Sequence, residues 1–373
     1  MPHRFQFNES LLNSVIGGRS AIDLPRMNLK TLAEADAFLR GYGFDPENQN
    51  DMEKLWYFHR RSLVLMQEKL GFSPEEIPEL LRDPKQLEDV RKLLLYASQS
   101  VTAHGADREL QRWSCALLRA MHVFVHSEND LFASFAEEIQ KQILSPFQSC
   151  ILHDGTTGKT YLRKVDDAAS GDEAISLNGF EVKPFKTSSS TVIKLLAKPD
   201  ALALNVLDKL GVRFVTKSLF DVFLVVRFLV KENLISFPQI IPDQSTNNLY
   251  PVELFLKACE ELLPQAKKMD AEQMDQFLKD YLEAHKDEGS FFKKENLFSG
   301  GDYQFIKFIS RKLVRVEVPG GKGTFSFFYP FEVQIMDQSA HQKILSGPSA
   351  HQAYKKRQRM AARHRLFPDV ENP

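Results

Sequence analysis

The sequence predicts an α+β fold, in which a mixed β-sheet flanked by helices follows an all-helical N-terminal domain. Residues 1–150 place apolar side chains at helical spacing, with prolines between short pieces. A polar, glycine-rich stretch over 154–178 indicates a hairpin or loop. Beyond it, helical segments alternate with segments rich in Val and Phe, which is typical of an α+β domain. We therefore predict a helical domain over 1–150, a linker or hairpin over 151–179, and a second domain over 180–373.

Start signals and periodicity define the expected N-terminal helices. Thr31 can cap a helix over 31–39, because Glu34 follows three residues later in a capping-box pattern. The longest helix is expected over 108–144, where apolar residues recur on one face. It is predicted to break near 127–130, because Ser or Asn there can cap a new start. These patterns indicate helices but assign them no role.

The second domain is expected to contain both helices and strands. A Pro-Gly-Gly-Lys turn at 319–322 predicts that the strands on either side of it pair as a hairpin. Two helices between the other elements form an insertion over about 251–287. The predicted helices span 191–204, 218–231, 251–263, 271–285 and 349–364, and the predicted strands span 206–216, 312–318 and 323–336.

Composition and charge exclude several classes of protein. A formal net charge of −1 argues against a generally nucleic-acid-binding surface. Residues 354–365 are nevertheless strongly basic, which fits either an arm for phosphates or RNA or a solvated helix end. Cys115, Cys150 and Cys259 are far apart, so neither a disulfide frame nor a zinc site is indicated. With no apolar run of about 20 residues and no signal peptide, a cytoplasmic location is expected.

Two carboxylates on predicted strands point to metal-assisted chemistry. Asp208 lies at the head of one strand and Glu332 lies inside another. A charged residue in an apolar strand is costly to bury without a partner. Asp and Glu from neighbouring strands can jointly hold Mg²⁺, which prefers hard oxygen ligands and leaves positions for substrate phosphates. The alternative interpretation is that both side chains face solvent on edge strands.

A second pattern precedes Asp208 in the sequence. Lys186, Ser190 and Lys194 recur every four residues and would line one helical face beside the strand that carries Asp208. Two ammonium groups and a hydroxyl at a helix start suit a polyphosphate, because free backbone N–H groups add attraction there. A solvated helix face is the alternative.

Taken in order, these segments resemble RelA/SpoT-like (p)ppGpp synthetase domains, which have a nucleotidyltransferase-like fold, over about residues 180–360. Asp208-Lys-Leu-Gly-Val-Arg213 is similar to the family's Asp-x-x-Gly-x-Arg strand. The spacing of Lys186, Ser190 and Lys194 resembles its donor-phosphate segment. Two later segments also match: Glu332-Val-Gln334-Ile resembles the family's Glu-Val-Gln-Ile-Arg-Thr strand, and His351-Gln-Ala-Tyr-Lys355 matches its His-x-x-Tyr-Lys.

The resemblance implies Mg²⁺-dependent transfer of pyrophosphate from ATP to the 3′-hydroxyl of a nucleotide, with GTP or GDP as acceptor. Asp208 and Glu332 are implied to bind Mg²⁺, with Glu332 also acting as general base on the acceptor hydroxyl. Tyr303 is implied to stack on the acceptor base. The implied substrate-binding residues are Lys186, Ser190, Lys194, Arg213, Tyr303, Gln334, His351 and Lys355.

Departures from the family pattern lie mainly on the acceptor side. Pro184 takes the place of the family's first Arg, and Phe305 and Lys307 replace the Ser and His of the acceptor loop. Met336-Asp337 replaces Arg-Thr after the Glu strand. Two alternatives therefore stay open: a non-catalytic nucleotide-binding regulatory module, and a toxin that pyrophosphorylates tRNA.

Overall fold

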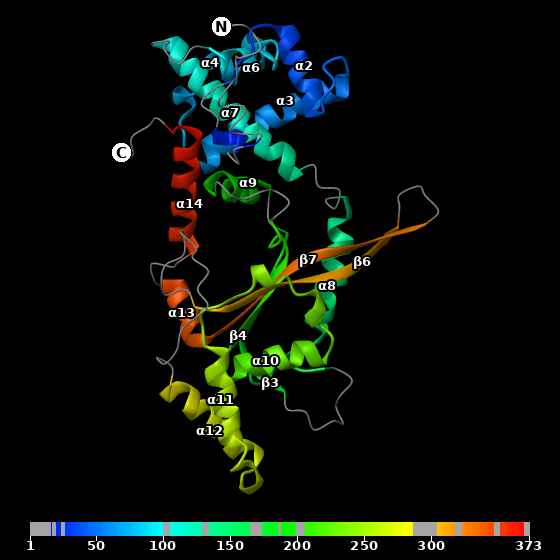
Figure 1. Ribbon diagram of the computed structural model, residues 1–373, viewed down its shortest axis with the longest axis vertical. Helices are drawn as coiled ribbons and strands as arrows, with labels where there is room; N and C mark the ends of the chain where they lie inside the picture. The colour runs from blue at the N-terminus through cyan, green and yellow to red at the C-terminus, as the bar shows by residue number, and fades with distance from the viewer. Residues whose placement is uncertain are drawn as a thin grey trace. The chain divides into compact units, whose positions relative to one another are not determined.

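The computed structural model forms two compact units (Figure 1). The helical unit contains residues 1–130, 187–206 and 356–373, and the sheet unit contains residues 131–186 and 207–355. This division differs from the sequence-based limits, because a segment after residue 186 and the C-terminal end pack with the N-terminal helices. The structure describes residues 16, 20–23, 27–99, 105–128, 134–164, 174–185, 188–198, 206–285, 304–317, 323–346 and 351–368.

The helical unit is built on α3 (Gln49–Val64) and α7 (Ala106–Glu128), which pack against each other. α9 (Ser188–Ala197) also packs on α7. The expected helix over 108–144 is in fact two helices. α7 ends at Glu128, where the break was predicted, and the second helix, α8, begins at Ala136. Smaller elements complete the unit: η2 (Ala21–Asp23), α2 (Leu32–Tyr42), η3 (Leu65–Lys69), η4 (Pro74–Glu76), α4 (Glu79–Arg82), α5 (Pro84–Leu87) and α6 (Lys92–Tyr96).

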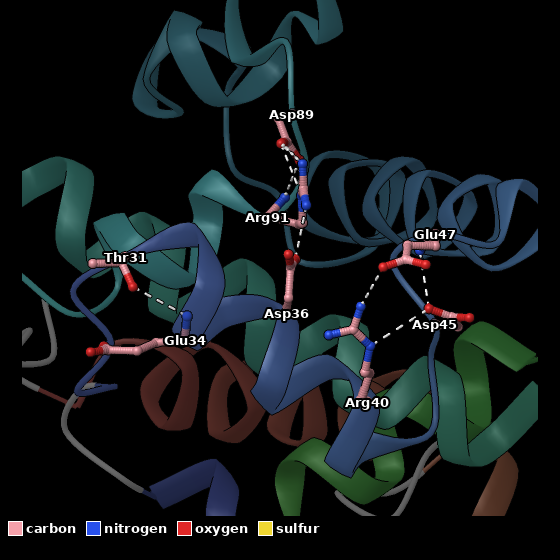
Figure 2. A network of polar contacts seen from close by, with 8 residues as sticks. All are labelled: Thr31, Glu34, Asp36, Arg40, Asp45, Glu47, Asp89 and Arg91. Atoms are coloured by element: carbon pink, nitrogen blue, oxygen red, sulfur yellow. Dashed lines mark hydrogen bonds and ion pairs between the residues drawn. The ribbon is translucent and has the colours of Figure 1, made fainter.

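Local polar contacts fix the start of α2 and its neighbours (Figure 2). The Thr31 hydroxyl accepts a hydrogen bond from the Glu34 backbone N–H, which confirms the predicted cap. The Glu34 carboxylate accepts from the Lys30 N–H instead of closing the box on Thr31. Arg91 joins two segments far apart in sequence, because its guanidinium pairs with Asp36 at 2.8 Å and Asp89 at 2.7 Å.

The basic C-terminal helix α14 (His351–Leu366) has interior contacts near its end. Arg365 pairs with Asp23 at 2.7 Å and donates to the carbonyls of Leu195 and Leu196 at the end of α9. Arg363 donates to the Leu70 carbonyl, and its guanidinium lies 3.8 Å from the centroid of a Phe ring. These two arginines therefore stabilise the helical unit, and neither a free phosphate-binding arm nor a solvated helix end describes them.

The sheet unit contains a seven-stranded mixed sheet in the order β1-β2-β3-β4-β7-β6-β5, as the predicted α+β class requires. All neighbouring strands are antiparallel except β4 and β7, which are parallel. The strands are β1 (Ile151–Asp154), β2 (Lys159–Leu162), β3 (Ile175–Lys183), β4 (Gly211–Thr216), β5 (Thr246–Asn247), β6 (Ile306–Glu317) and β7 (Thr324–Asp337).

One face of this sheet forms the core of the unit. Val212 and Phe214 on β4 and Val333 and Ile335 on β7 are completely buried, whereas the residues between them, Arg213 and Gln334, are polar. This alternation follows from the two-residue period of a strand. The core face packs against α10 (Leu219–Lys231), which contacts β3, β4 and β7. Further helices of the unit are α8 (Ala136–Ser149), α11 (Val252–Leu262), α12 (Ala271–Ala284) and α13 (Gln338–Ser346), with the short η7 (Phe237–Gln239), η8 (Pro242–Gln244) and η9 (Ala266–Lys268).

Several observed elements differ from the expected ones, and β4 begins at Gly211, five residues after the predicted start of that strand. The region over 151–179 contains the predicted hairpin, formed by β1 and β2, but also much of the unpredicted strand β3, whose outward polar residues hide its strand pattern. β6 begins at Ile306, six residues before the predicted strand, because it continues along β7 to that point. α13 is an additional helix, and Asp337 begins it by accepting a hydrogen bond from the Ala340 N–H. None of the described helices is long and apolar enough to cross a bilayer.

Gly211 fixes the distance between β4 and β7. A Cβ at this position would lie 2.5 Å from the Glu332 carbonyl oxygen, closer than such atoms can approach. We expect Gly211→Ala to lower the free energy of unfolding by about 1–3 kcal/mol, because overpacking moves backbone. Denaturant unfolding followed by circular dichroism measures the loss.

Gly179→Ala is a matched control in the same sheet. Its Cβ would meet only the Val215 side chain, at an ordinary contact distance of 3.8 Å. An equal loss of stability in both variants would contradict the steric explanation for Gly211.

Candidate active site

The parallel pair β4–β7 brings the two predicted carboxylates to one end of the sheet. Its register places Gly211 beside Glu332 and Arg213 beside Gln334. Just before β4 starts, the Leu210 carbonyl accepts a hydrogen bond from the Glu332 N–H at 2.8 Å. Asp208 lies two residues before that carbonyl, and its charge acts on the Glu332 carboxylate. Glu332 therefore lies within β7 as predicted, whereas Asp208 precedes the neighbouring strand β4 by three residues and is not at its head.

Glu332 is a buried carboxylate with a close cationic partner. The residue is only 7% exposed, and its Oε1 accepts a hydrogen bond from the Lys183 Nζ at 2.7 Å. Lys183 lies at the end of β3, whose backbone pairs with Gly211. Because Gly211 has no side chain, the ammonium group reaches across β4 to Glu332. The alternative interpretation, in which Glu332 faces solvent on an edge strand, is excluded.

Gln334 connects Glu332 to the next row of polar side chains. Its Oε1 accepts hydrogen bonds from Lys183 at 2.7 Å and from the Arg213 Nε at 2.9 Å. Arg213 also pairs with Glu181 on β3 at 2.9 Å. All of these residues occupy the face of the sheet opposite the apolar core. The arrangement is a continuous polar network, which holds each member in one orientation.

The pKa of the Glu332 carboxyl is lowered despite its burial. Desolvation is the largest single influence and raises the pKa. The charges of Lys183 and Lys307, together with the Lys183 hydrogen bond, lower it and outweigh burial, even though the Asp208 charge also raises it. Glu332 is therefore ionised at neutral pH, as both a metal ligand and a proton acceptor must be.

The residues at this position suit a hard divalent cation. Asp208 and Glu332 supply carboxylate oxygens, and Mg²⁺ is commonly held by one or two carboxylates with its other positions left to water and phosphates. Among the described residues, no group of three or more His, Cys, Asp or Glu side chains could hold a metal ion. A site built from these two carboxylates therefore depends on substrate oxygens to complete it.

The other predicted binding residues are distributed differently. Ser190 and Lys194 lie on α9, which belongs to the helical unit, whereas Asp208 belongs to the sheet unit. The apolar face of α9 is buried in the helical core through Val192 and Leu196. Lys355 is exposed on α14. Lys186, Tyr303 and the side chain of His351 lie outside the described residues, so their predicted roles stay predictions.

Three residues around Glu332 were not predicted as site residues: Glu181, Lys183 and Lys307. In the structure Lys307 pairs with Gln334 across β6 and β7, on the same face as Glu332. Glu181 and Lys183, two apart on β3, carry the alternation that could have indicated a polar strand face. Phe305 is buried in the core, and its N–H donates to the Asn248 side chain at 2.8 Å.

Comparison with solved structures finds similarity to a small alarmone synthetase and to a GTP pyrophosphokinase family protein. Small alarmone synthetase 1 from Bacillus subtilis, bound to its product pppGpp, matches at 12% identity over 64% of this chain and 88% of that chain, with a TM-score of 0.30. A GTP pyrophosphokinase family protein from Streptococcus pneumoniae matches at 15% identity over 52% of this chain and 72% of that chain, with a TM-score of 0.26. No family model and no curated protein matches the sequence.

The Lys183–Glu332 pair predicts a pH-dependent stability. In the wild type the pKa of Glu332 is lower in the folded than in the unfolded state. The ionised carboxylate therefore stabilises the fold at pH values above the unfolded-state pKa, and this stabilisation is lost as the pH falls through the folded-state pKa. In Lys183→Met the desolvation remains without its main compensation, so the pKa of Glu332 rises. We expect the variant to lose roughly 1–3 kcal/mol at neutral pH. The loss should shrink at acidic pH, where Glu332 becomes protonated.

Urea unfolding at pH 7 and at roughly pH 4 measures this difference. Lys92→Met is a matched control, because Lys92 pairs with Glu88 at a similar 2.6 Å on the surface, where Glu88 is 70% exposed. Exposed ion pairs contribute little to stability, so Lys92→Met should lose much less than Lys183→Met. A loss of stability in Lys183→Met that does not change with pH would contradict the conclusion that Lys183 keeps Glu332 ionised.

Proposed function

We propose that this protein catalyses Mg²⁺-dependent transfer of pyrophosphate from ATP to the 3′-hydroxyl of a nucleotide. The main support is the buried, ionised Glu332 beside the charge of Asp208, at the end where the parallel strands β4 and β7 meet. Three cations, Lys183, Arg213 and Lys307, lie on the same face of the sheet. This combination of carboxylates and cations suits phosphoryl chemistry, in which positioning and charge neutralisation supply most of the catalysis.

Glu332 is the proposed general base. Its ionised carboxylate would accept the proton from the acceptor 3′-hydroxyl, while the freed oxygen forms a bond to the β-phosphorus of ATP. The bond between that phosphorus and the oxygen bridging to the α-phosphate breaks, and AMP leaves with the electron pair. Mg²⁺ held by Asp208 and Glu332 would neutralise charge on the transferred phosphates.

The cations of the network have a second proposed role. Lys183 and Arg213 now neutralise Glu332 and Glu181, and both reach Gln334. When phosphates are present, the same two cations can also balance phosphate charge without a change of fold. Lys186, Ser190 and Lys194 are proposed donor-phosphate contacts on their motif alone, as are His351 and Lys355. Tyr303 is proposed to stack on the acceptor base.

The acceptor is proposed to be a guanosine nucleotide, GTP or GDP. The loop that would read it differs from the family pattern, because Phe305 is part of the core and Lys307 faces Gln334. An adenosine nucleotide and a tRNA 3′ end are therefore included as acceptors in the test below.

Removing either carboxylate should abolish transfer. Glu332→Gln and Asp208→Asn remove a negative charge without changing shape, and we expect each to lower the rate of transfer by at least about 100-fold. Purified protein incubated with Mg²⁺, ATP labelled in its terminal phosphate, and GTP, ATP or tRNA measures this by chromatography of the labelled product.

Glu253→Gln on α11 is the control, because Glu253 is exposed and lies outside the network. No transfer to any acceptor by the wild type would reject the enzyme hypothesis. Calorimetry would then test the alternative of a regulatory module, which requires nucleotide binding that survives Glu332→Gln.

The rate should also depend on pH in a stated direction. Because the pKa of Glu332 is lowered, activity should persist below the usual glutamate value of about 4.3 before it falls as the carboxyl is protonated. In Lys183→Met the acid limb of the kcat/KM profile should move to higher pH. Circular dichroism at each pH separates protonation from unfolding, and an unchanged acid limb would exclude Glu332 as the group that titrates.

A further inference from the structure

The hairpin of β6 and β7 continues well beyond the rest of the sheet (Figure 1). β7 pairs with β4 only from Glu332 onward, and β6 pairs with β5 only at its first two residues. Residues 311–317 and 324–330 therefore form a two-stranded ribbon, here called the arm. Such a ribbon is marginally stable by itself and needs packing on one face.

One face of the arm is held by the core and by α8. Val314, Val316 and Tyr329 are at most 3% exposed and belong to the core of the sheet unit. The side chain of Gln142 on α8 also bonds both the N–H and the carbonyl of Arg315, at 3.1 Å and 2.6 Å. The core therefore covers this face of the arm and leaves the opposite face uncovered.

The opposite face displays an aromatic ring between two cations. Phe328 is 50% exposed and pairs across the ribbon with Leu313. Arg311 and Arg315 are exposed on β6, two residues to either side of Leu313, and so share its face. Neither guanidinium makes an ion pair with a residue that the structure describes. On this face of the arm the acidic residue is Glu317, at the far end.

We propose that this face of the arm binds a single-stranded polynucleotide, with a base stacked on Phe328 and phosphates on Arg311 and Arg315. Proteins that bind single strands without sequence preference combine cations that follow the backbone with aromatic rings on which bases stack. Two unpaired cations beside an exposed ring match this chemistry and favour a polyanion over an apolar protein surface.

The same face leads to the carboxylate site. Phe328, Pro330 and Glu332 alternate along β7, so they point to one side of the sheet. Four residues of strand separate the ring from Glu332 by about 13 Å. On β6, Lys307 continues the row of Arg311 and Arg315 at the same four-residue interval. A strand bound along the arm would have its end close to Glu332, but binding itself does not require the proposed transfer reaction.

Fluorescence anisotropy of the full chain with a labelled single-stranded RNA and a DNA of the same sequence tests the proposal. We expect binding that weakens as salt rises. Phe328→Ser should lower the affinity about fivefold or more, and Arg315→Gln should reduce the slope of log affinity against log salt by about 1. A loss confined to RNA would identify the 2′-hydroxyl as part of the ligand, while equal losses would identify the shared phosphates and bases.

Two matched variants test whether the effect belongs to this face. Phe325→Ser alters a ring that is 40% exposed on the other face of the arm, and Lys141→Gln removes an exposed cation from α8. Both should bind as the wild type does. Absence of binding by the wild type, or an equal loss in Phe325→Ser, would overturn the proposal. So would a wild-type dimer in light scattering that Phe328→Ser makes monomeric, because Phe328 would then be a contact between copies.

Discussion

The close contact between β4 and β7 at Gly211 is the constraint on which the site depends. A Cβ there would lie 3.0 Å from the Glu332 Cβ, so glycine alone lets the parallel strands approach as they do. The missing side chain also leaves the path by which Lys183 on β3 reaches Glu332 on β7. One residue therefore sets both the backbone spacing and the ion pair, and the Gly of the Asp-x-x-Gly-x-Arg motif has a physical reason.

Burial and charge oppose each other at Glu332, and the balance explains the chemistry available there. Burial raises the pKa of the carboxyl, and the nearby Asp208 charge acts in the same direction. Lys183 and Lys307 reverse the outcome, so a buried carboxylate stays ionised. Replacing a buried pair by apolar residues is often harmless to stability, whereas removing one partner is costly. An ionised carboxylate at this position is what the proposed roles of Glu332 in metal binding and proton transfer require.

The two faces of the sheet differ in character: one is apolar and forms the core, and the other is polar and carries the candidate site. The core face, with Phe214 and Ile335, attaches α10 and gives the unit its stability. The polar face carries the network around Gln334 and continues onto the arm past Phe328. Because alternate residues of a strand point to opposite sides, the residues of β7 that pack in the core are not the residues that form the polar network. In the basic run of α14, by contrast, Arg363 and Arg365 bond to backbone carbonyls of the helical unit.

The sequence by itself determined the α+β class and most helices, because local periodicity records these features directly. It did not reveal β3 or the start of β6, since a strand with a polar face and bulged register has a weak signal, and only pairing with β4 or β7 defines it. Tertiary structure also decided that Lys183 is the partner of Glu332, because that contact crosses 149 residues of chain. Tertiary structure also decided the position of α9, which carries Ser190 and Lys194 and follows β3 closely in sequence. Its apolar face joins the helical core, and burial of that face outweighs proximity along the chain.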